Sequence, residues 1–159
     1  MEQSRLNIVT GATGYTGKYI TRRLLAMGQR VKSLTGHPNR DNPFGAQVPV
    51  LPFNFDHPKA LAESLRGATT LYNTYWVRFS YANVTFDDAV RNTKTLLAAA
   101  KTAGVKKVVH ISIANPDANS ALPYYRGKGV LEQAVMDCGL SYAILRPTDR
   151  KSTRLNSSH

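Results

Sequence analysis

Three glycines spaced three residues apart, Gly11, Gly14 and Gly17, separate an apolar segment at 6–9 from a helix-compatible run at 18–25. A strand, a glycine turn and a helix in this order point backbone N–H groups and a helix N-terminus at a pyrophosphate. The first glycine turns the chain, the second lets phosphates approach the backbone, and the third lets the helix lie close to the strand. The pattern predicts a nucleotide site, and the other expected contact residues are Thr10, Thr13, Tyr15 and Thr16.

A second group of residues could carry acid–base chemistry. Tyr124 and Lys128 are four residues apart in a predicted helix, so they share a face. An ammonium beside the phenol would lower its pKa from about 10 towards neutrality, which suits general acid–base catalysis. Ser112, on the preceding predicted strand, is the nearest candidate for an orienting hydroxyl donor. Tyr125 is the alternative tyrosine, about 100° round the helix.

These residues lie in a regular alternation of expected strands and helices. Strands are expected near 6–10, 31–35, 48–53, 69–74, 106–112 and 141–145, and helices near 15–27, 58–66, 82–103 and 123–138. Strict alternation predicts a parallel sheet with helices on both faces, and ligands beyond the carboxyl ends of its strands. Glycines at 28, 67, 104 and 139 are expected to end the helices, and Asp56 to cap the second one.

The glycine motif, read from Thr10 as Thr-Gly-x-x-Gly-x-x-Gly, resembles that of the extended and atypical short-chain dehydrogenases/reductases. Further segments are similar to the NmrA-like, NAD(P)-binding group: Val31–Thr35, Val108–Ser112, Tyr124-x-x-x-Lys128 and Leu145–Thr148. The resemblance covers residues 6–148 and implies an α/β, Rossmann-type doubly wound sheet of order 3-2-1-4-5-6, without most of the substrate-binding part. It also implies Tyr124 as proton donor and Lys128 as a ligand of the nicotinamide ribose.

The loop after the second predicted strand bears on the choice of cofactor. An NAD site usually has a carboxylate there, but this chain has no acid before Asp41. Thr35 could bond a 2′-phosphate, and His37 and Arg40 could supply charge to it. Gly36 stands where NADP-binding relatives often have an arginine. NADP is therefore favoured over NAD, with an ordinary solvated loop as the alternative.

Two further loops are expected to complete the site. Asn54 and Phe55 follow the third strand, where relatives contact the adenine, although Phe55 could equally belong to the core. Asn73 and Thr74 end the fourth strand and are included among the cofactor contacts. The aromatic run at 75–79 then lies over the nicotinamide and the substrate, or simply covers the sheet edge.

The last eleven residues, 149–159, lack apolar periodicity and match a translation of a common sequencing-library adapter. We therefore expect a natural NAD(P)-binding domain at 1–148 and a non-native tail at 149–159. Without the tail, three of 21 basic and one of 10 acidic residues are lost, and the net charge falls from +11 to +9. The basic residues form no stripe, which argues against a dedicated nucleic-acid role.

Cys138 is the only cysteine, which excludes an internal disulfide and a cysteine-rich metal site, and no metal is expected. The five residues before the first strand leave no room for a signal peptide, and no apolar run reaches membrane-spanning length. We expect a cytoplasmic location. The favoured function is an NAD(P)(H)-dependent oxidoreductase or epimerase for a small carbonyl, quinone or sugar nucleotide. The alternative is a non-catalytic NADP(H)-sensing regulator or assembly protein with a protein partner.

Overall fold

A computed structural model of the chain describes residues 4–76 and 85–147, and the predicted tail at 149–159 and loop residues 77–79 lie outside that description. The strands are β1 (Leu6–Thr10), β2 (Arg30–Thr35), β3 (Val50–Pro52), β4 (Ala68–Asn73), β5 (Lys107–Ile111) and β6 (Ser141–Leu145). The helices are α1 (Tyr15–Ala26), α2 (Pro58–Leu65), α3 (Phe86–Ala103) and α4 (Pro123–Met136), and a short 3-10 turn, η1, spans Gly45–Gln47. The predicted alternation of strands and helices is confirmed.

All six strands are parallel, in the order β3-β2-β1-β4-β5-β6. The order confirms the Rossmann-type, doubly wound sheet. The chain leaves β1 towards β2 on one side and returns to β4 on the other, so the strand order reverses between β1 and β4. In such sheets this reversal opens a crevice at the carboxyl ends of the strands.

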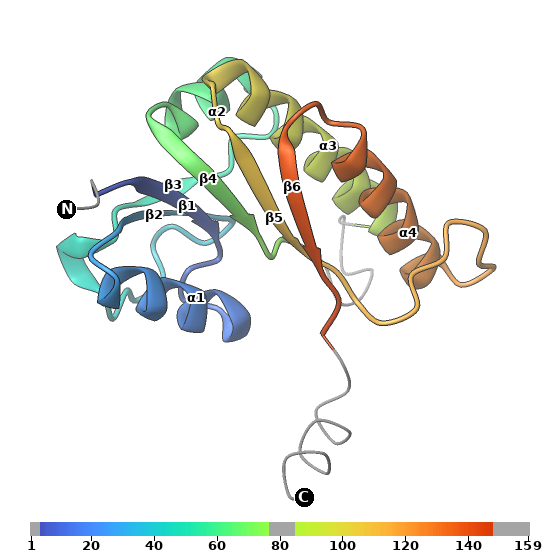
Figure 1. Cartoon of the computed structure of the whole chain (residues 1–159), viewed down its shortest axis with the longest axis horizontal. Helices are drawn as coiled ribbons and strands as arrows, with labels where there is room; N and C mark the ends of the chain where they lie inside the picture. The colour runs from blue at the N-terminus through green and yellow to red at the C-terminus, as the bar shows by residue number, and fades with distance from the viewer. Residues whose placement is uncertain (1–3, 77–84, 148–159) are drawn as a thin grey trace, which may run out of the picture.

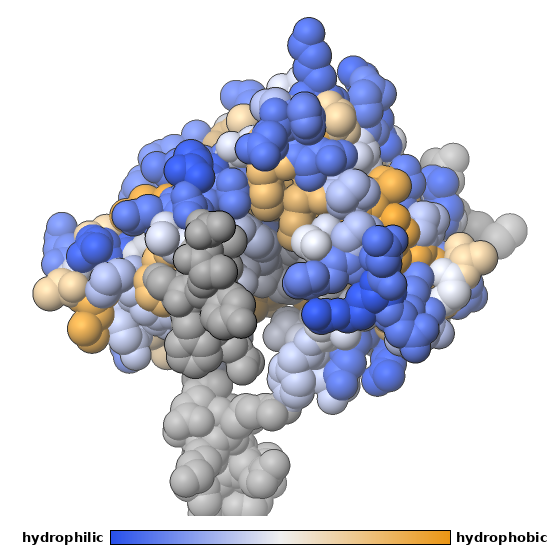
Figure 2. All heavy atoms as spheres, turned by 180° about the vertical axis from the view of Figure 1, so that it is seen from behind, coloured by the Kyte–Doolittle hydropathy of each residue, from blue (hydrophilic) through white to orange (hydrophobic). Residues whose placement is uncertain are grey.

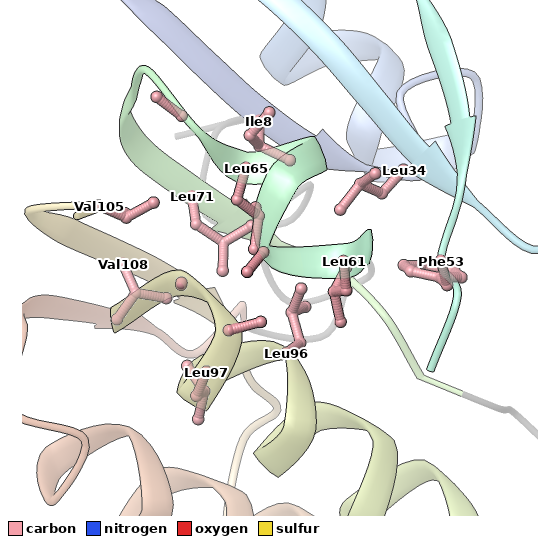
Figure 3. Close-up of a cluster of buried hydrophobic side chains, with 14 of the residues drawn as sticks. Ile8, Leu34, Phe53, Leu61, Leu65, Leu71, Leu96, Leu97, Val105 and Val108 are labelled. Carbon is pink, nitrogen blue, oxygen red and sulfur yellow. The ribbon is translucent and has the colours of Figure 1, made fainter. Parts of the chain in front are cut away.

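Helices cover both faces of the sheet, with α2, α3 and α4 on one side and α1 on the other (Figure 1). The larger core lies between the sheet and the three-helix layer, where Ile8 and Leu71 meet Leu61 of α2 and Leu96 of α3 (Figure 3). Val9, next to Ile8, points the opposite way and packs with Leu24 of α1. Burial on both faces explains why β1 has no polar–apolar alternation.

The helix ends follow local chemistry, with one correction. Gly28, Gly67, Gly104 and Gly139 all have φ between 77° and 86°, as predicted for residues that end helices. Asp56, however, does not cap α2: the capping position is His57, and no side chain bonds the helix end. Pro58 holds its preceding residue out of the helical region, and the His57 N–H donates to the Asn54 carbonyl in a turn that leaves Asp56 outside the helix.

On the face seen from behind, most of the described surface is hydrophilic, with some apolar groups gathered near its middle (Figure 2). None of the helices within 4–76 and 85–147 is both long and apolar enough to cross a membrane. The same residues contain no cluster of three or more His, Cys, Asp or Glu side chains suited to a metal ion. Cys138 is a half-buried free thiol.

Candidate active site

The glycine turn joins β1 to α1 in the predicted geometry. Gly11 has a φ of 66°, which favours glycine, and its N–H donates to the Leu34 carbonyl at 2.8 Å. A Cβ on Gly17 would lie 1.9 Å from the Gly11 carbonyl oxygen, so only glycine lets α1 approach this closely. Gly14 caps α1, and the first turn contains no acidic residue. The positive end of the helix dipole therefore faces the cleft without a neutralising carboxylate.

A cleft of about 400 Å³ lies at the carboxyl ends of the strands. It brings together the glycine turn and the candidate catalytic residues, which are far apart in the chain. Its walls are formed by Thr10, Gly11, Gly14, Tyr15, Thr16, Gly17, Thr35, Phe53, Thr74, Tyr75, Trp76, Ile111, Ser112, Ile113, Tyr124, Lys128 and Pro147. The cleft therefore brings together the two sets of residues that the sequence analysis singled out, the glycine turn and the candidate acid–base residues.

A second hollow of about 700 Å³ shares four wall residues with the cleft and extends it beyond β2 and β3. His37, Asn54 and Phe55, which the sequence predicts as cofactor contacts, line it. Phe55 also stacks on Phe53, with ring centroids 4.6 Å apart and planes at 14°, so it both packs against the core and faces the hollow. Arg40 is exposed on the loop after β2, which also carries His37, but it does not form part of the wall of this hollow.

Thr10 and Thr74 tie the ends of β1 and β4 together. The Thr74 N–H donates to the Thr10 hydroxyl at 2.7 Å, and the Thr74 hydroxyl donates to the Thr10 carbonyl at 2.6 Å. Both residues line the cleft, but their hydroxyl groups already serve this tie. Thr13, by contrast, is not in the cleft wall.

Asn73 lies behind the cleft wall rather than in it. Its side chain is fully buried and accepts hydrogen bonds from the Thr10 hydroxyl and the Tyr75 N–H. Its amide group faces Nδ1 of His110 at 3.1 Å. Asn73 therefore supports residues of the wall, and its contact with the cofactor stays a prediction.

Lys128 is buried beneath an aromatic side chain. Only 4% of it is exposed, and its Nζ lies 4.5 Å from the centre of the Trp76 ring. Burial lowers the pKa of Lys128 to about 8, although the negative charge of Glu132 opposes the fall. The indole also lies against Gly127, where a Cβ would approach Cη2 of Trp76 to 2.8 Å. A glycine before the lysine therefore allows the tryptophan to cover it.

The structure distinguishes the two candidate tyrosines. Tyr124 lines the cleft and meets the Trp76 and Phe86 rings edge-on, each at 5.9 Å between centroids. Tyr125 is 39% exposed and is not in the wall. Tyr124 is therefore the tyrosine placed to act in the cleft. Ile113, which also lines it, supplies no hydroxyl group.

Ser112 lines the cleft, but its hydroxyl group donates its proton to Glu132, which is not part of the cleft wall. Its Oγ lies 2.5 Å from Oε2 of Glu132, a buried carboxylate on α4. Burial raises the pKa of Glu132, but hydrogen bonds from Arg146 and Ser112 outweigh it and the net change is downwards. An ionised carboxylate only accepts, so Ser112 must donate to it. The predicted orienting donor to the substrate is corrected: Ser112 faces the cleft as an acceptor.

Glu132, Arg146 and His110 were not singled out from the sequence as site residues. Glu132 stands four positions after Lys128, a spacing that places both on one helix face, and this signal could have found it. His110 is fully buried on β5, and burial lowers its pKa to about 4. Its Nε2 has no hydrogen-bond partner within the described part of the chain. No sequence pattern marks His110, since a strand histidine is compatible with either face.

Comparison with known proteins agrees with this geometry. The sequence profile of the NAD(P)H-binding family matches residues 11–155. The chain belongs to this family. It is 28% identical over 142 residues to the photosystem II assembly factor Ycf39 of Cyanophora paradoxa, covering 87% of this chain and 44% of that protein. It is 31% identical over 152 residues to a (4-alkanoyl-5-oxo-2,5-dihydrofuran-3-yl)methyl phosphate reductase of Streptomyces griseus, covering 94% and 49%.

Solved structures share the fold of this NAD(P)H-binding domain. The Citrobacter sp. triphenylmethane reductase complexed with NADP(H) superposes with a TM-score of 0.69 at 22% identity, covering 88% of this chain and 48% of that one. A short-chain dehydrogenase/reductase superfamily protein of Agrobacterium tumefaciens with bound NAD gives 0.67 at 21%, covering 89% and 48%. The chain thus spans about half the length of the proteins it matches.

Proposed function

We propose that this domain serves an NADP(H)-dependent oxidoreductase or epimerase of the short-chain dehydrogenase/reductase type. The observation that carries the proposal is that one cleft holds both the glycine turn and the Tyr124–Lys128 pair. The residues present fit a dinucleotide. Gly17 allows α1 to approach the turn, the first turn of α1 has no acid, and two connected hollows extend from the turn past β2.

Each part of the cleft has a distinct task. When bound, the cofactor supplies or accepts the hydride. Backbone N–H groups at the start of α1 bind the phosphates, and Asn54 and Phe55 hold the adenine. The Tyr124 hydroxyl gives its proton to the substrate oxygen during reduction and takes it back during oxidation. The Lys128 cation favours the phenolate form of Tyr124 and also bonds the ribose. The Trp76 and Phe86 rings, stacked at 5.6 Å, keep water from these groups.

The preference for NADP rests on the loop after β2. Thr35 lines both hollows, and its hydroxyl accepts the His37 N–H at 3.1 Å, which folds the loop over the site. His37 lines the wall, and Arg40 is exposed close by in sequence. With no carboxylate before Asp41, a 2′-phosphate meets positive rather than negative charge here.

The substrate class is proposed as a small carbonyl, quinone or sugar nucleotide. Trp76 and Tyr124 make the cleft wall aromatic here, and Phe86, outside the wall, stacks on Trp76 and meets Tyr124 edge-on. Such walls suit a planar group. The relative from Streptomyces griseus is a reductase, and the structural neighbours include a triphenylmethane reductase and a nucleoside-diphosphate-sugar epimerase, which supports this range.

A second candidate function is a non-catalytic NADP(H)-sensing or assembly role with a protein partner. Relatives include an assembly factor for photosystem II and the 40 kDa subunit of the Neurospora crassa NADH-ubiquinone oxidoreductase, the latter 27% identical. One feature of the site favours it: Trp76 covers Lys128. This cover would slow chemistry without preventing cofactor binding.

Hydride transfer separates the two functions. The full-length protein is incubated with NADPH and a panel of aldehydes, ketones, quinones and nucleotide sugars, and cofactor oxidation is followed at the nicotinamide absorbance. The oxidoreductase proposal expects turnover that saturates with at least one substrate. Tight NADPH binding without turnover on any panel member would instead support the sensor or assembly role.

A further inference from the structure

A buried carboxylate beside the cleft has no part in the mechanism above. Glu132 is 3% exposed and lies one helical turn after Lys128 on α4. Burying an ionised group is costly unless partners compensate for the lost water. Its partners therefore indicate what the carboxylate does.

Three elements meet at this carboxylate. Ser112, directly after β5, donates from Oγ to Oε2 at 2.5 Å. Arg146, directly after β6, donates from Nη2 to Oε1 at 2.5 Å and from Nε to Oε2 at 3.0 Å. The two other ion pairs within the described part of the chain, Glu63–Arg66 and Asp88–Arg91, join neighbours within or beside one helix. Glu132 instead fixes α4 against the carboxyl ends of two strands.

The same carboxylate sets the direction of a proton in the cleft wall. Its ionised form can only accept, so the Ser112 hydroxyl donates to it and keeps its lone pairs for other donors. Ser112 is 4% exposed and lines the cleft. A substrate hydroxyl in the cleft can therefore donate to Ser112, whereas a carbonyl oxygen gains nothing from it.

Glu132 also governs the charge around Lys128. The titratable groups around the lysine are Tyr124 and Glu132, each four positions away on its own helix, and His110 on β5, while Arg146 pairs with Glu132 itself. Of these, only Glu132 is negatively charged, and its charge raises the pKa of Lys128 against the effect of burial. Without the carboxylate, the buried ammonium would lose this opposing charge, and the Arg146 guanidinium would lose its partner.

We propose that Glu132 is a positioning residue, which turns the Ser112 hydroxyl into an acceptor and keeps Lys128 charged beside Tyr124. The inference rests on the proposed function, because Tyr124 and Lys128 are the groups that it serves. Glu132 itself does not touch the reacting atoms. It acts through the two side chains that line the cleft.

The test measures the charge of Lys128 directly, in the full-length protein labelled with ¹³C-lysine. The ¹³Cε shift of Lys128, assigned with Lys128→Met, is followed against pH in the wild type and in Glu132→Gln. The variant keeps the side-chain shape but removes the charge, so we expect the midpoint to fall by about one unit or more. Glu132→Asp keeps the charge and should restore the wild-type midpoint. Glu63→Gln, which breaks an exposed pair on α2, should leave it unchanged.

In Arg146→Met we expect the titration midpoint of Lys128 to shift in the opposite direction. This substitution removes the cation that pairs with Glu132, so the negative charge of the carboxylate acts more strongly on Lys128 and the midpoint should rise. If Glu132 had only a structural role, the titration midpoint of Lys128 would shift in the same direction in both variants. An unchanged midpoint in Glu132→Gln, or a fall in Arg146→Met, would overturn the proposal; the second result decides if Glu132→Gln does not fold. NADPH titration of the wild type and of each variant distinguishes failure of this proposal from failure of the proposed function. Only a wild-type protein that does not bind NADPH would count against the proposed function.

Discussion

The Gly11 carbonyl oxygen occupies the space that a side chain on Gly17 would need. A Cβ built there lies 1.9 Å from that oxygen and 2.7 Å from its carbon, and both are backbone atoms that cannot move aside. The first turn of α1 and the turn after β1 are thus in direct contact. This contact holds the helix N-terminus at the edge of the cleft, where we propose that the phosphates bind.

Gly17→Ala should destabilise the domain and weaken cofactor binding together. The added methyl group must push α1 away from the turn, at an expected cost of about 2 kcal/mol or more. Urea unfolding and NADPH titration measure the two effects. Gly36→Ala is the control for stability, because its Cβ meets nothing within 4 Å and its φ is not positive. Equal stability of the two variants would show that the close contact is absent in solution.

Arg40→Ala should reduce the preference for NADPH over NADH. A charge-assisted bond to the 2′-phosphate contributes about 1.5–3 kcal/mol, so the ratio of the two dissociation constants should fall about tenfold or more. Arg22→Ala, on the exposed side of α1, is the matched control and should leave the ratio intact. If Arg40→Ala leaves the ratio of the two dissociation constants unchanged, Arg40 in the loop after β2 does not determine the choice of cofactor.

Tyr124→Phe should lower turnover by about 10²–10⁴-fold in the full-length protein, with NADPH affinity nearly unchanged. Only the proton-bearing hydroxyl is lost, and the ring keeps its edge-on contacts with Trp76 and Phe86. Tyr125→Phe, at the neighbouring position outside the cleft wall, is the control and should retain activity. Full turnover in Tyr124→Phe would retire the tyrosine mechanism.

Acid should destabilise the domain through His110. Burial lowers its pKa from 6.5 to about 4, so the unfolded chain binds a proton in this range more readily than the folded one. Stability present above pH 6.5 is therefore lost as the pH falls towards 4, by about 3 kcal/mol in total. Urea unfolding between pH 7 and 5 should show this slope in the wild type and in His57→Gln, which alters an exposed histidine. In His110→Phe the slope should be much shallower, whatever its absolute stability.

The backbone arrangement of the candidate site could be predicted from the sequence. The glycine spacing and the alternation of strands and helices predicted the turn, the parallel sheet and the edge where the cleft lies, because these depend on local conformation and on general rules of chain connection. The order of the strands followed from the family resemblance. The positions of Tyr124 and Lys128 followed from helical spacing. The α2 cap was missed by one residue, since Pro58 restricts His57 in a way that favours it over Asp56.

The direction of individual hydrogen bonds could not be predicted in this way. Ser112 was expected to donate into the cleft, but its donation to Glu132 depends on a carboxylate twenty positions later and on Arg146 after the last strand. The position of Asn73 at the end of β4 likewise does not reveal that the pairing of β4 with β5 places it opposite His110. Such partners are set by tertiary packing, which spacing alone does not reveal.

Cofactor titration of the wild type and Gly14→Val tests the central claim most directly. Gly14 caps α1 with extended backbone angles that valine can adopt, and a Cβ there would lie 3.2 Å from the Gly11 carbonyl oxygen, so the fold should survive with a small adjustment. The valine side chain would instead occupy the cleft where the pyrophosphate approaches. NADPH binding, followed by nicotinamide fluorescence or calorimetry, should be readily measured in the wild type and abolished in a folded Gly14→Val protein. Equal affinity in the two would contradict the claim that the glycine turn is the dinucleotide site.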